Sequence, residues 1–208
     1  MRKKWIIGID EVGRGPLAGP ITVAAVAATA HDKFQMTNNK KIPKFKILKN
    51  IKNSKKLSPT QREIWNEKIC DGYAYAISSV SPAVIDRVGI GKAAKLAIFR
   101  CLMKLTKRYT LSPKCLLIVL DGGLYAPKTY AHQETIIKGD ERHPLIAAAS
   151  IVAKVHRDAR MIRLHKKFSV YGFDQHKGYG TALHRAALKA HGLSSVHRQS
   201  FCGNMRSW

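Results

Sequence analysis

Acidic residues are scarce in this sequence, whose 208 residues include 13 Asp and Glu but 37 Lys and Arg. The formal net charge is therefore +24 at pH 7. An excess of this size points to a polyanionic partner, because each phosphate that a protein neutralises releases condensed counterions. Nucleic acid is the first candidate for this partner, and an anionic membrane surface is the alternative.

Long hydrophobic runs are also lacking, which argues against the membrane alternative. The apolar stretch behind the basic residues 1–4 is broken by Asp10, and the run over residues 21–30 is far shorter than the ~20 residues that span a bilayer. The four cysteines form no Cys-x-x-Cys motif, so we predict reduced core thiols rather than disulfides or a zinc site. These absences favour a cytoplasmic protein without a membrane segment.

Strand-like and helix-like segments alternate along the chain, a pattern typical of α/β proteins. Apolar and β-branched runs predict strands over residues 5–10, 21–28, 73–80 and 115–121. Start signals and periodicity predict helices that begin at Ser58-Pro59, Ser81-Pro82 and Pro144, and further helices over residues 91–109 and 181–191. We predict a single domain over residues 1–208, with a basic loop insertion at 31–52 and a small helical part at about 170–208.

The long helix that begins at Pro144 is expected to bury one apolar stripe. Residues expected on that stripe are Leu145, Ala149, Val152, His156, Ala159 and Ile162. The remaining surface of the helix is expected to carry basic residues, each of which is as well explained by a solvated charge as by a contact to phosphate: Lys154, Arg157, Arg160, Arg163, Lys166 and Lys167.

Carboxylates stand at the ends of three strand-like runs: Asp10 with Glu11, Asp121, and Asp140 after the short run at 135–137. Such ends can lie side by side in a sheet, where four carboxylates repel one another unless they bind protons or a cation. That cation could be a Lys or Arg side chain, which would make the acids ordinary salt-bridge partners. It could equally be a divalent metal such as Mg²⁺, and the pattern alone leaves both open.

A Gly13-Arg14-Gly15 turn follows the first carboxylate pair directly. Glycines let backbone amides approach a ligand closely, and a positive charge between them suits a phosphate or a sugar. Any tight turn could carry this sequence, so the motif by itself does not select a ligand.

These motifs together resemble those of ribonuclease HII, the type 2 ribonuclease H family, in its bacterial form. They follow the family's order over nearly the whole chain: Asp10-Glu11-Val12-Gly13-Arg14-Gly15-Pro16, Ser54-Lys55-Lys56-Leu57, Asp121-Gly122-Gly123, Gly139-Asp140, Ser150-Ile151-Val152-Ala153-Lys154-Val155-His156-Arg157-Asp158, His176-Lys177-Gly178-Tyr179-Gly180 and His197-Arg198. The chain departs from the family pattern at Asn53, where the family usually has Asp, so that position loses a charge.

The resemblance implies a ribonuclease H-like mixed sheet flanked by helices and a metal-dependent endonuclease. The implied substrates are RNA–DNA hybrids and duplex DNA that contains ribonucleotides, cut 5′ to the ribonucleotide to leave a 3′-hydroxyl and a 5′-phosphate. The catalytic and metal-binding acids carried over by motif are Asp10, Glu11, Asp121 and Asp140. They would hold two divalent ions, Mg²⁺ or Mn²⁺.

The resemblance also implies the residues that bind the substrate. Gly13, Arg14 and Gly15 would read the ribose 2′-hydroxyl, and Tyr179 would stack on the neighbouring deoxyribose. Lys55 would position a phosphate. The expected protein is a monomer with no obligate protein partner.

Two alternatives come from other functional classes. A non-catalytic basic module would bind nucleic acid without regard to Mg²⁺ and would cut nothing. Another two-metal nuclease of the same fold, such as a junction resolvase, would cut without regard to the 2′-hydroxyl.

Overall fold

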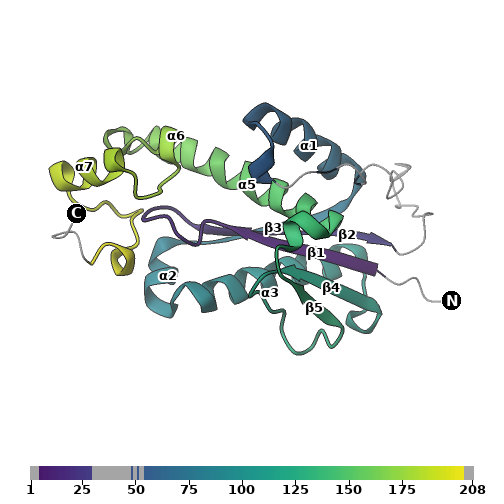
Figure 1. Cartoon of the computed structure of the whole chain (residues 1–208). Helices are drawn as coiled ribbons and strands as arrows, with labels where there is room; N and C mark the ends of the chain where they lie inside the picture. Colours follow the sequence, from purple (N-terminus) through teal and green to yellow (C-terminus); the bar gives the residue numbers. More distant parts are fainter. Residues whose placement is uncertain (1–4, 30–47, 49–50, 52–53, 204–208) are drawn as a thin grey trace.

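A five-stranded mixed sheet in the order β3-β2-β1-β4-β5 forms the centre of the fold (Figure 1). The computed structural model describes residues 5–29, 48, 51 and 54–203. Its strands are β1 (Trp5–Val12), β2 (Ile21–Thr29), β3 (Ala74–Val80), β4 (Leu116–Asp121) and β5 (Gln133–Ile136). Strands β1, β2 and β3 pair antiparallel, while β4 runs parallel to both β1 and β5. The mixed sheet predicted from the resemblance is therefore confirmed.

Helices cover both faces of the sheet (Figure 1). Helices α1 (Pro59–Gly72) and α5 (Pro144–His165) lie on one face, and α2 (Pro82–Val88) and α3 (Ile90–Tyr109) lie on the other. All nine residues of β2 are buried because each of its faces contributes to a separate apolar cluster. This explains why the strand is a continuous apolar run rather than an alternating one.

Helix α5 approaches β1 unusually closely at Gly8. A Cβ atom at this position would lie 2.5 Å from the carbonyl oxygen of Leu145 and 2.6 Å from the amide nitrogen of Ile146. Only glycine permits this contact, since real side chains do not approach backbone atoms so closely. The contact brings the start of α5 against the strand that carries Asp10.

The C-terminal part is helical, as predicted, and lies at the opposite end of the sheet from the start of β1 (Figure 1). It contains α6 (Phe173–His176) and α7 (Ala182–His191), with Thr181 and Gly192 capping α7. His184 and His197 are buried there and their Nε2 atoms lie 3.1 Å apart. Burial lowers the pKa of each to about 4, so both rings are neutral at pH 7.

Two expectations about local structure are wrong. Asp140 does not end a strand: it lies in the short helix α4 (Gly139–Arg142), because β5 stops at Ile136. On α5, His156 and Ile162 are exposed, whereas Arg157 and Met161 are fully buried. The buried stripe shifts because this half of α5 packs on the C-terminal part and the turn after β1 instead of on the sheet.

The remaining expectations concern cysteines, membranes and the basic insertion. The four cysteines are free thiols, of which Cys101 and Cys202 are buried. No described helix has the length and apolarity needed to cross a bilayer. Asn53 and most of residues 31–52 lie outside the described residues. Of the insertion, Leu48 and Ile51 are described, and both pack in the cluster beneath α1 and α5.

A matched pair of serines tests the role of helix capping. Ser58 caps α1 with a complete capping box, in which its Oγ accepts from Gln61 N at 3.2 Å and Gln61 Oε1 accepts from Ser58 N at 2.9 Å. Ser81 starts α2 without a side-chain capping bond. Chemical denaturation should show a loss of about 1 kcal/mol for Ser58→Ala and a clearly smaller loss for Ser81→Ala. Equal losses would contradict this assignment.

Candidate active site

The four predicted acids line one cavity at the edge of the sheet. Its volume is about 280 Å³, and its wall includes Asp10, Glu11, Asp121 and Asp140. Because β1 and β4 are parallel neighbours, their carboxyl ends meet at the same edge and bring Asp10 and Asp121 together. The strand-end pattern therefore predicted the meeting of these two correctly.

Asp10 is the most deeply buried of the acids, with 5% of its surface exposed. One of its carboxylate oxygens accepts from the Glu11 amide at 2.8 Å, and Ser150 of α5 also hydrogen-bonds its side chain. The Ser150 hydroxyl in turn lies 2.8 Å from that of Ser54. Neither serine had been singled out as a site residue, because each had been noted only as a member of a family motif.

Asp121 links the end of β4 to α4. Its Oδ1 accepts from the Gly139 amide at 2.6 Å and lies 3.4 Å from the Asp140 amide. A Cβ at Gly139 would crowd both Asp121 Oδ1 and Ile146. Asp140 thus enters the cavity through a carboxylate-held turn, which no strand periodicity could have predicted.

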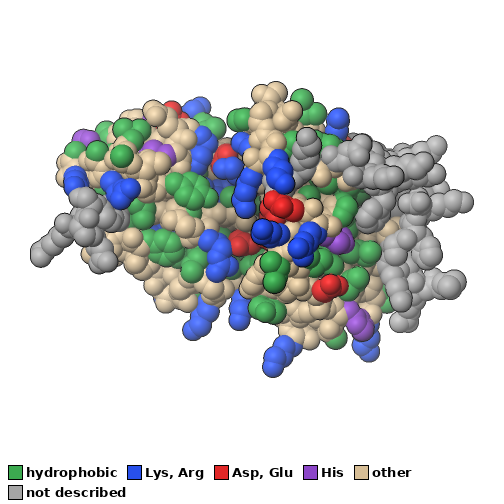
Figure 2. Space-filling model, in the orientation of Figure 1, with side chains coloured by type: hydrophobic (Ala, Val, Ile, Leu, Met, Phe, Trp, Pro, Cys, Tyr) green, Lys and Arg blue, Asp and Glu red, His purple; other side chains and the backbone are tan. Residues whose placement is uncertain are grey.

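Cationic side chains compensate these acids only weakly. Lys55 Nζ lies 3.9 Å from Asp140 Oδ2, and Arg14 Nη1 lies 3.6 Å from Glu11 Oε1. The side chain of Lys55 is 85% exposed and that of Arg14 is 48% exposed, so water screens both pairs strongly. Figure 2 shows acidic side chains near the middle of one face with Lys and Arg around them. The salt-bridge interpretation therefore accounts for only part of the charge.

The pKa values of three of the acids are raised, which shows that the charged form of each is disfavoured in the cavity. Burial raises the pKa of Asp10 well above its usual range, and the charges of Glu11 and Asp121 raise it further. Burial also raises the pKa of Glu11, although Arg14 opposes this shift. Burial and the Asp121 charge raise the pKa of Asp140, against the effect of Lys55.

The donor set fits divalent cations. Carboxylate oxygens are the ligands that Mg²⁺ and Mn²⁺ prefer, and the raised pKa values show that a further positive charge would be favourable here. Among the described residues, no group of three or more His, Cys, Asp or Glu side chains is arranged so that it could hold a metal ion by itself. An open arrangement suits Mg²⁺, which is usually held by one or two carboxylates together with water and substrate phosphate.

The predicted substrate-binding residues flank this cavity. Lys55 and Tyr179 belong to its wall, and the side chain of Tyr179 is partly exposed. Arg14 and Gly15 are exposed on the turn after β1, whereas Gly13 is buried. Lys154, expected only as a candidate surface cation, and Arg62, which the sequence analysis did not select, also line the cavity.

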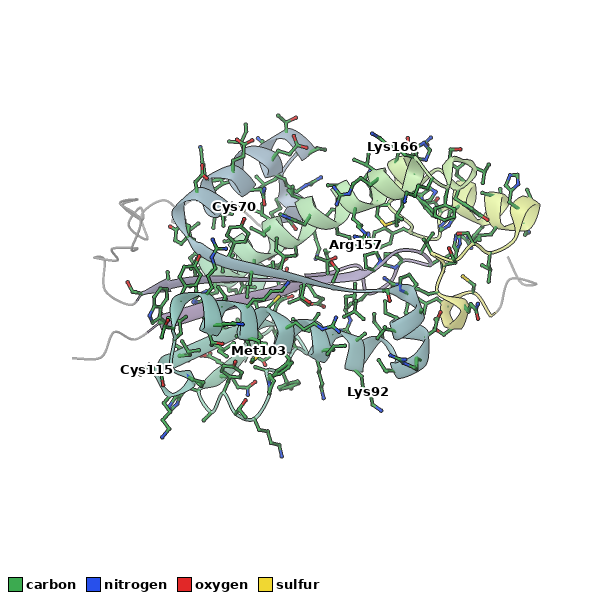
Figure 3. The ribbon with its side chains drawn as sticks, turned by 180° about the vertical axis from the view of Figure 1, so that it is seen from behind. Cys70, Lys92, Met103, Cys115, Arg157 and Lys166 are labelled. Atoms are coloured by element: carbon green, nitrogen blue, oxygen red, sulfur yellow. The ribbon has the colours of Figure 1, made fainter. Side chains whose placement is uncertain are left out.

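Arg157 does not contact solvent, contrary to the expectation that it lies on the basic surface of α5. It is fully buried and donates to the carbonyls of Pro20, Lys177 and Ala18 at 3.0, 3.0 and 3.2 Å. Figure 3 shows Arg157 on the side of α5 that faces the strands. This guanidinium joins the turn after β1 to the loop that carries Tyr179, so it fixes the position of both segments beside the cavity.

A mixed α/β sheet with an acid-lined cavity at its edge, in a strongly basic chain, defines a nuclease of the ribonuclease H-like fold. The fold comparison agrees: ribonuclease HII from Archaeoglobus fulgidus, solved as a complex with PCNA, superimposes with a TM-score of 0.72. The two sequences are 27% identical, and the match covers 97% of this chain and 96% of that one.

Sequence comparison identifies the family. The ribonuclease HII model matches residues 7–204. Ribonuclease HII of Polynucleobacter asymbioticus is 39% identical over 97% of this chain and 94% of its own length. That of Syntrophobacter fumaroxidans is 43% identical over 95% of this chain and 76% of its own length. The chain belongs to the ribonuclease HII family, and it is accordingly a ribonuclease H, an endoribonuclease that acts on RNA–DNA hybrids.

The raised pKa of Asp10 predicts an unusual pH dependence of stability. An acid whose pKa is higher in the folded state destabilises the fold as pH rises above its unfolded value of about 4. At pH 7 in EDTA, Asp10→Asn should therefore be more stable than the unchanged protein, and the difference should vanish near pH 4. Adding Mg²⁺ or Mn²⁺ should raise the melting temperature of the unchanged protein more than that of the variant.

Asp86 provides a control of opposite sign. Burial raises the pKa of Asp86, but hydrogen bonds from Ser200 and Gln199 outweigh this effect and lower it. Such an acid stabilises the fold above its unfolded pKa and loses this contribution as pH falls. Asp86→Asn should thus be less stable than the unchanged protein at pH 7, so a gain in stability for both variants would refute the electrostatic account of Asp10.

Gly13 and Gly15 of the turn should respond differently to alanine. Gly13 has φ +90°, and a Cβ there would lie 2.7 Å from Arg157 Cδ and 2.9 Å from the Pro20 carbonyl oxygen. We expect Gly13→Ala to cost about 1–3 kcal/mol in chemical denaturation. Gly15→Ala has open space and no positive φ, so its stability should change by less than about 0.5 kcal/mol.

Proposed function

We propose that this chain is a divalent-metal-dependent endonuclease that also incises duplex DNA 5′ to embedded ribonucleotides and leaves 3′-hydroxyl and 5′-phosphate ends. The observation that carries this proposal is the juxtaposition of two features at one place. Four carboxylates line a cavity where only exposed Lys55 and Arg14 pair with them, and the Gly13-Arg14-Gly15 turn follows directly after two of them. Family membership supports the same substrate class.

The acids have a common role in this proposal. Asp10, Glu11, Asp121 and Asp140 would hold two divalent ions, Mg²⁺ or Mn²⁺. Such ions, when bound, lower the pKa of an attacking water and stabilise the departing 3′-oxygen. Ser150 and the Glu11 amide orient the Asp10 carboxylate, and the Gly139 amide orients that of Asp121.

Positive side chains around the cavity would position the substrate backbone. Lys55, Arg62 and Lys154 line the cavity beside the acids, where they can approach a phosphate. Lys154 is partly restrained, since its Nζ lies 2.9 Å from Asp158 Oδ1. The wider basic surplus would add affinity without sequence preference, and binding should therefore weaken with salt.

The turn after β1 and Tyr179 would supply the choice of sugar. The 2′-hydroxyl is the group that distinguishes RNA from DNA at a given position. Exposed amides at Arg14 and Gly15 offer donors for it, and the partly exposed Tyr179 offers an aromatic face for the next sugar. Two of the proposed metal-binding acids, Asp10 and Glu11, would thus be followed directly in the chain by the turn that recognises the sugar.

A duplex with one embedded ribonucleotide tests the proposal. It is incubated with the protein in Mg²⁺, in Mn²⁺ or in EDTA, next to an all-deoxy duplex of the same sequence. We expect metal-dependent incision 5′ to the ribonucleotide and no cutting of the control. Binding without any cutting would favour the non-catalytic alternative, and cutting of both duplexes would favour a two-metal nuclease that ignores the 2′-hydroxyl.

Replacing Asp121 separates chemistry from binding. Asp121→Asn keeps the shape of the side chain but removes one charge from the cavity. We expect cleavage to fall by at least about 10³-fold while affinity for the duplex in EDTA changes little. Turnover close to that of the unchanged protein would remove Asp121 from the metal site. Glu141→Gln, outside the cavity wall, is the matched control.

A further inference from the structure

Arg198 is fully buried, and its guanidinium donates three hydrogen bonds, all of them to backbone carbonyls. Its Nη2 donates to Gly13 O at 2.7 Å, its Nη1 to Arg14 O at 2.9 Å and its Nε to Gly19 O at 3.0 Å. No salt bridge joins it to a carboxylate within the described residues. A buried guanidinium is costly, so these three bonds are what compensates its lost hydration.

Two of these bonds set the orientation of peptide planes. A trans peptide unit is planar, and its C=O and N–H groups point in opposite directions. When Arg198 holds Gly13 O, the N–H of Arg14 must point away from the guanidinium. The bond to Arg14 O directs the N–H of Gly15 away in the same manner.

The two amides directed in this way remain available for a ligand. Among the described residues, neither Arg14 N–H nor Gly15 N–H donates to a protein acceptor. Both residues are exposed, and the space where a Gly15 side chain would project is open. The turn therefore presents two adjacent donors with a fixed orientation.

We infer that Arg198 is a positioning residue for ribose recognition: it holds the carbonyl side of the Gly13–Gly15 turn so that the Arg14 and Gly15 amides face the 2′-hydroxyl. This inference rests on the proposed function of the turn. It assigns sugar selectivity to a residue that is 184 positions away from Arg14 in sequence and does not touch the substrate.

Arg198 is itself held by its neighbours in the chain. Its amide donates to Leu17 O at 2.8 Å, and the adjacent His197 forms a β-bridge with Ala18. Asp86 of α2 accepts from the amides of the next two residues, Gln199 and Ser200, both at 3.0 Å. The C-terminal segment is thus fastened to α2 on one side and to the turn after β1 on the other.

Binding to two duplexes tests the inference. The duplexes are identical except for one ribonucleotide, and affinity is measured by fluorescence anisotropy in EDTA so that neither is cut. The readout is the ratio of the two dissociation constants. We expect the unchanged protein to prefer the ribonucleotide about tenfold, as two hydrogen bonds to a hydroxyl allow.

Arg198→Lys keeps the positive charge but cannot donate to three carbonyls in a planar fork. The ratio should fall to near one, while affinity for the all-deoxy duplex changes less than about twofold because phosphate contacts remain. A purely structural role would weaken binding to both duplexes alike and keep the ratio. A folded Arg198→Lys protein with the original ratio overturns the inference.

Two further variants keep the test decisive. Asp86→Ala leaves Arg198 in place but loosens the segment that carries it, and it should lower the ratio by about threefold; an unchanged ratio in this folded variant counts against the inference even if Arg198→Lys does not fold. Lys104→Met is the matched control, since Lys104 also donates to a backbone carbonyl, that of Ile77 at 2.7 Å, far from the turn. A lowered ratio in this control would overturn the inference as well.

A failure of the proposed function has a different signature. If the unchanged protein binds both duplexes equally, the turn does not read the 2′-hydroxyl, and Arg198 has nothing to position. If the unchanged protein discriminates and the Arg198 and Asp86 variants do so equally well, ribose recognition stands and only the role of Arg198 is lost.

Discussion

The burial of like charges is the constraint on which the acid-lined cavity depends. Parallel pairing of β1 with β4 brings Asp10 and Asp121 to one edge of the sheet, and the Gly139 amide fastens Asp140 beside them. Burial is the largest cause of the raised pKa of Asp10 and Asp140. The apolar clusters on both sides of the sheet must hold this unfavourable arrangement in place until a cation relieves it.

The cations that reach these acids, Lys55 and Arg14, are exposed and relieve the repulsion only in part, and two buried arginines do not relieve it at all. Arg157 and Arg198 are both fully buried, and the guanidinium of each donates its hydrogen bonds to backbone carbonyls. If either guanidinium paired with the acids, it would offset part of their negative charge and weaken their affinity for a metal. The same pair of residues gives the turn after β1 its shape, so the separation of charge also serves recognition.

Local patterns predicted the elements well, because caps, turns and apolar runs act over a few residues. The capping box of Ser58, the start of α5 at Pro144 and the end of β4 at Asp121 all lie where the sequence indicates. The errors have one origin. Asp140 and the buried face of α5 are decided by contacts with segments distant in sequence, which periodicity cannot detect.

The sequence by itself determined the fold class and the family, since ordered motifs and hydrophobic patterns are present along the chain. It also indicated a polyanionic partner, because Lys and Arg outnumber Asp and Glu so strongly. Only the tertiary structure decided where each guanidinium goes. An arginine in a basic helix and one near the C-terminus look like surface cations, and only folding brings both beneath the turn after β1, where carbonyls replace their water.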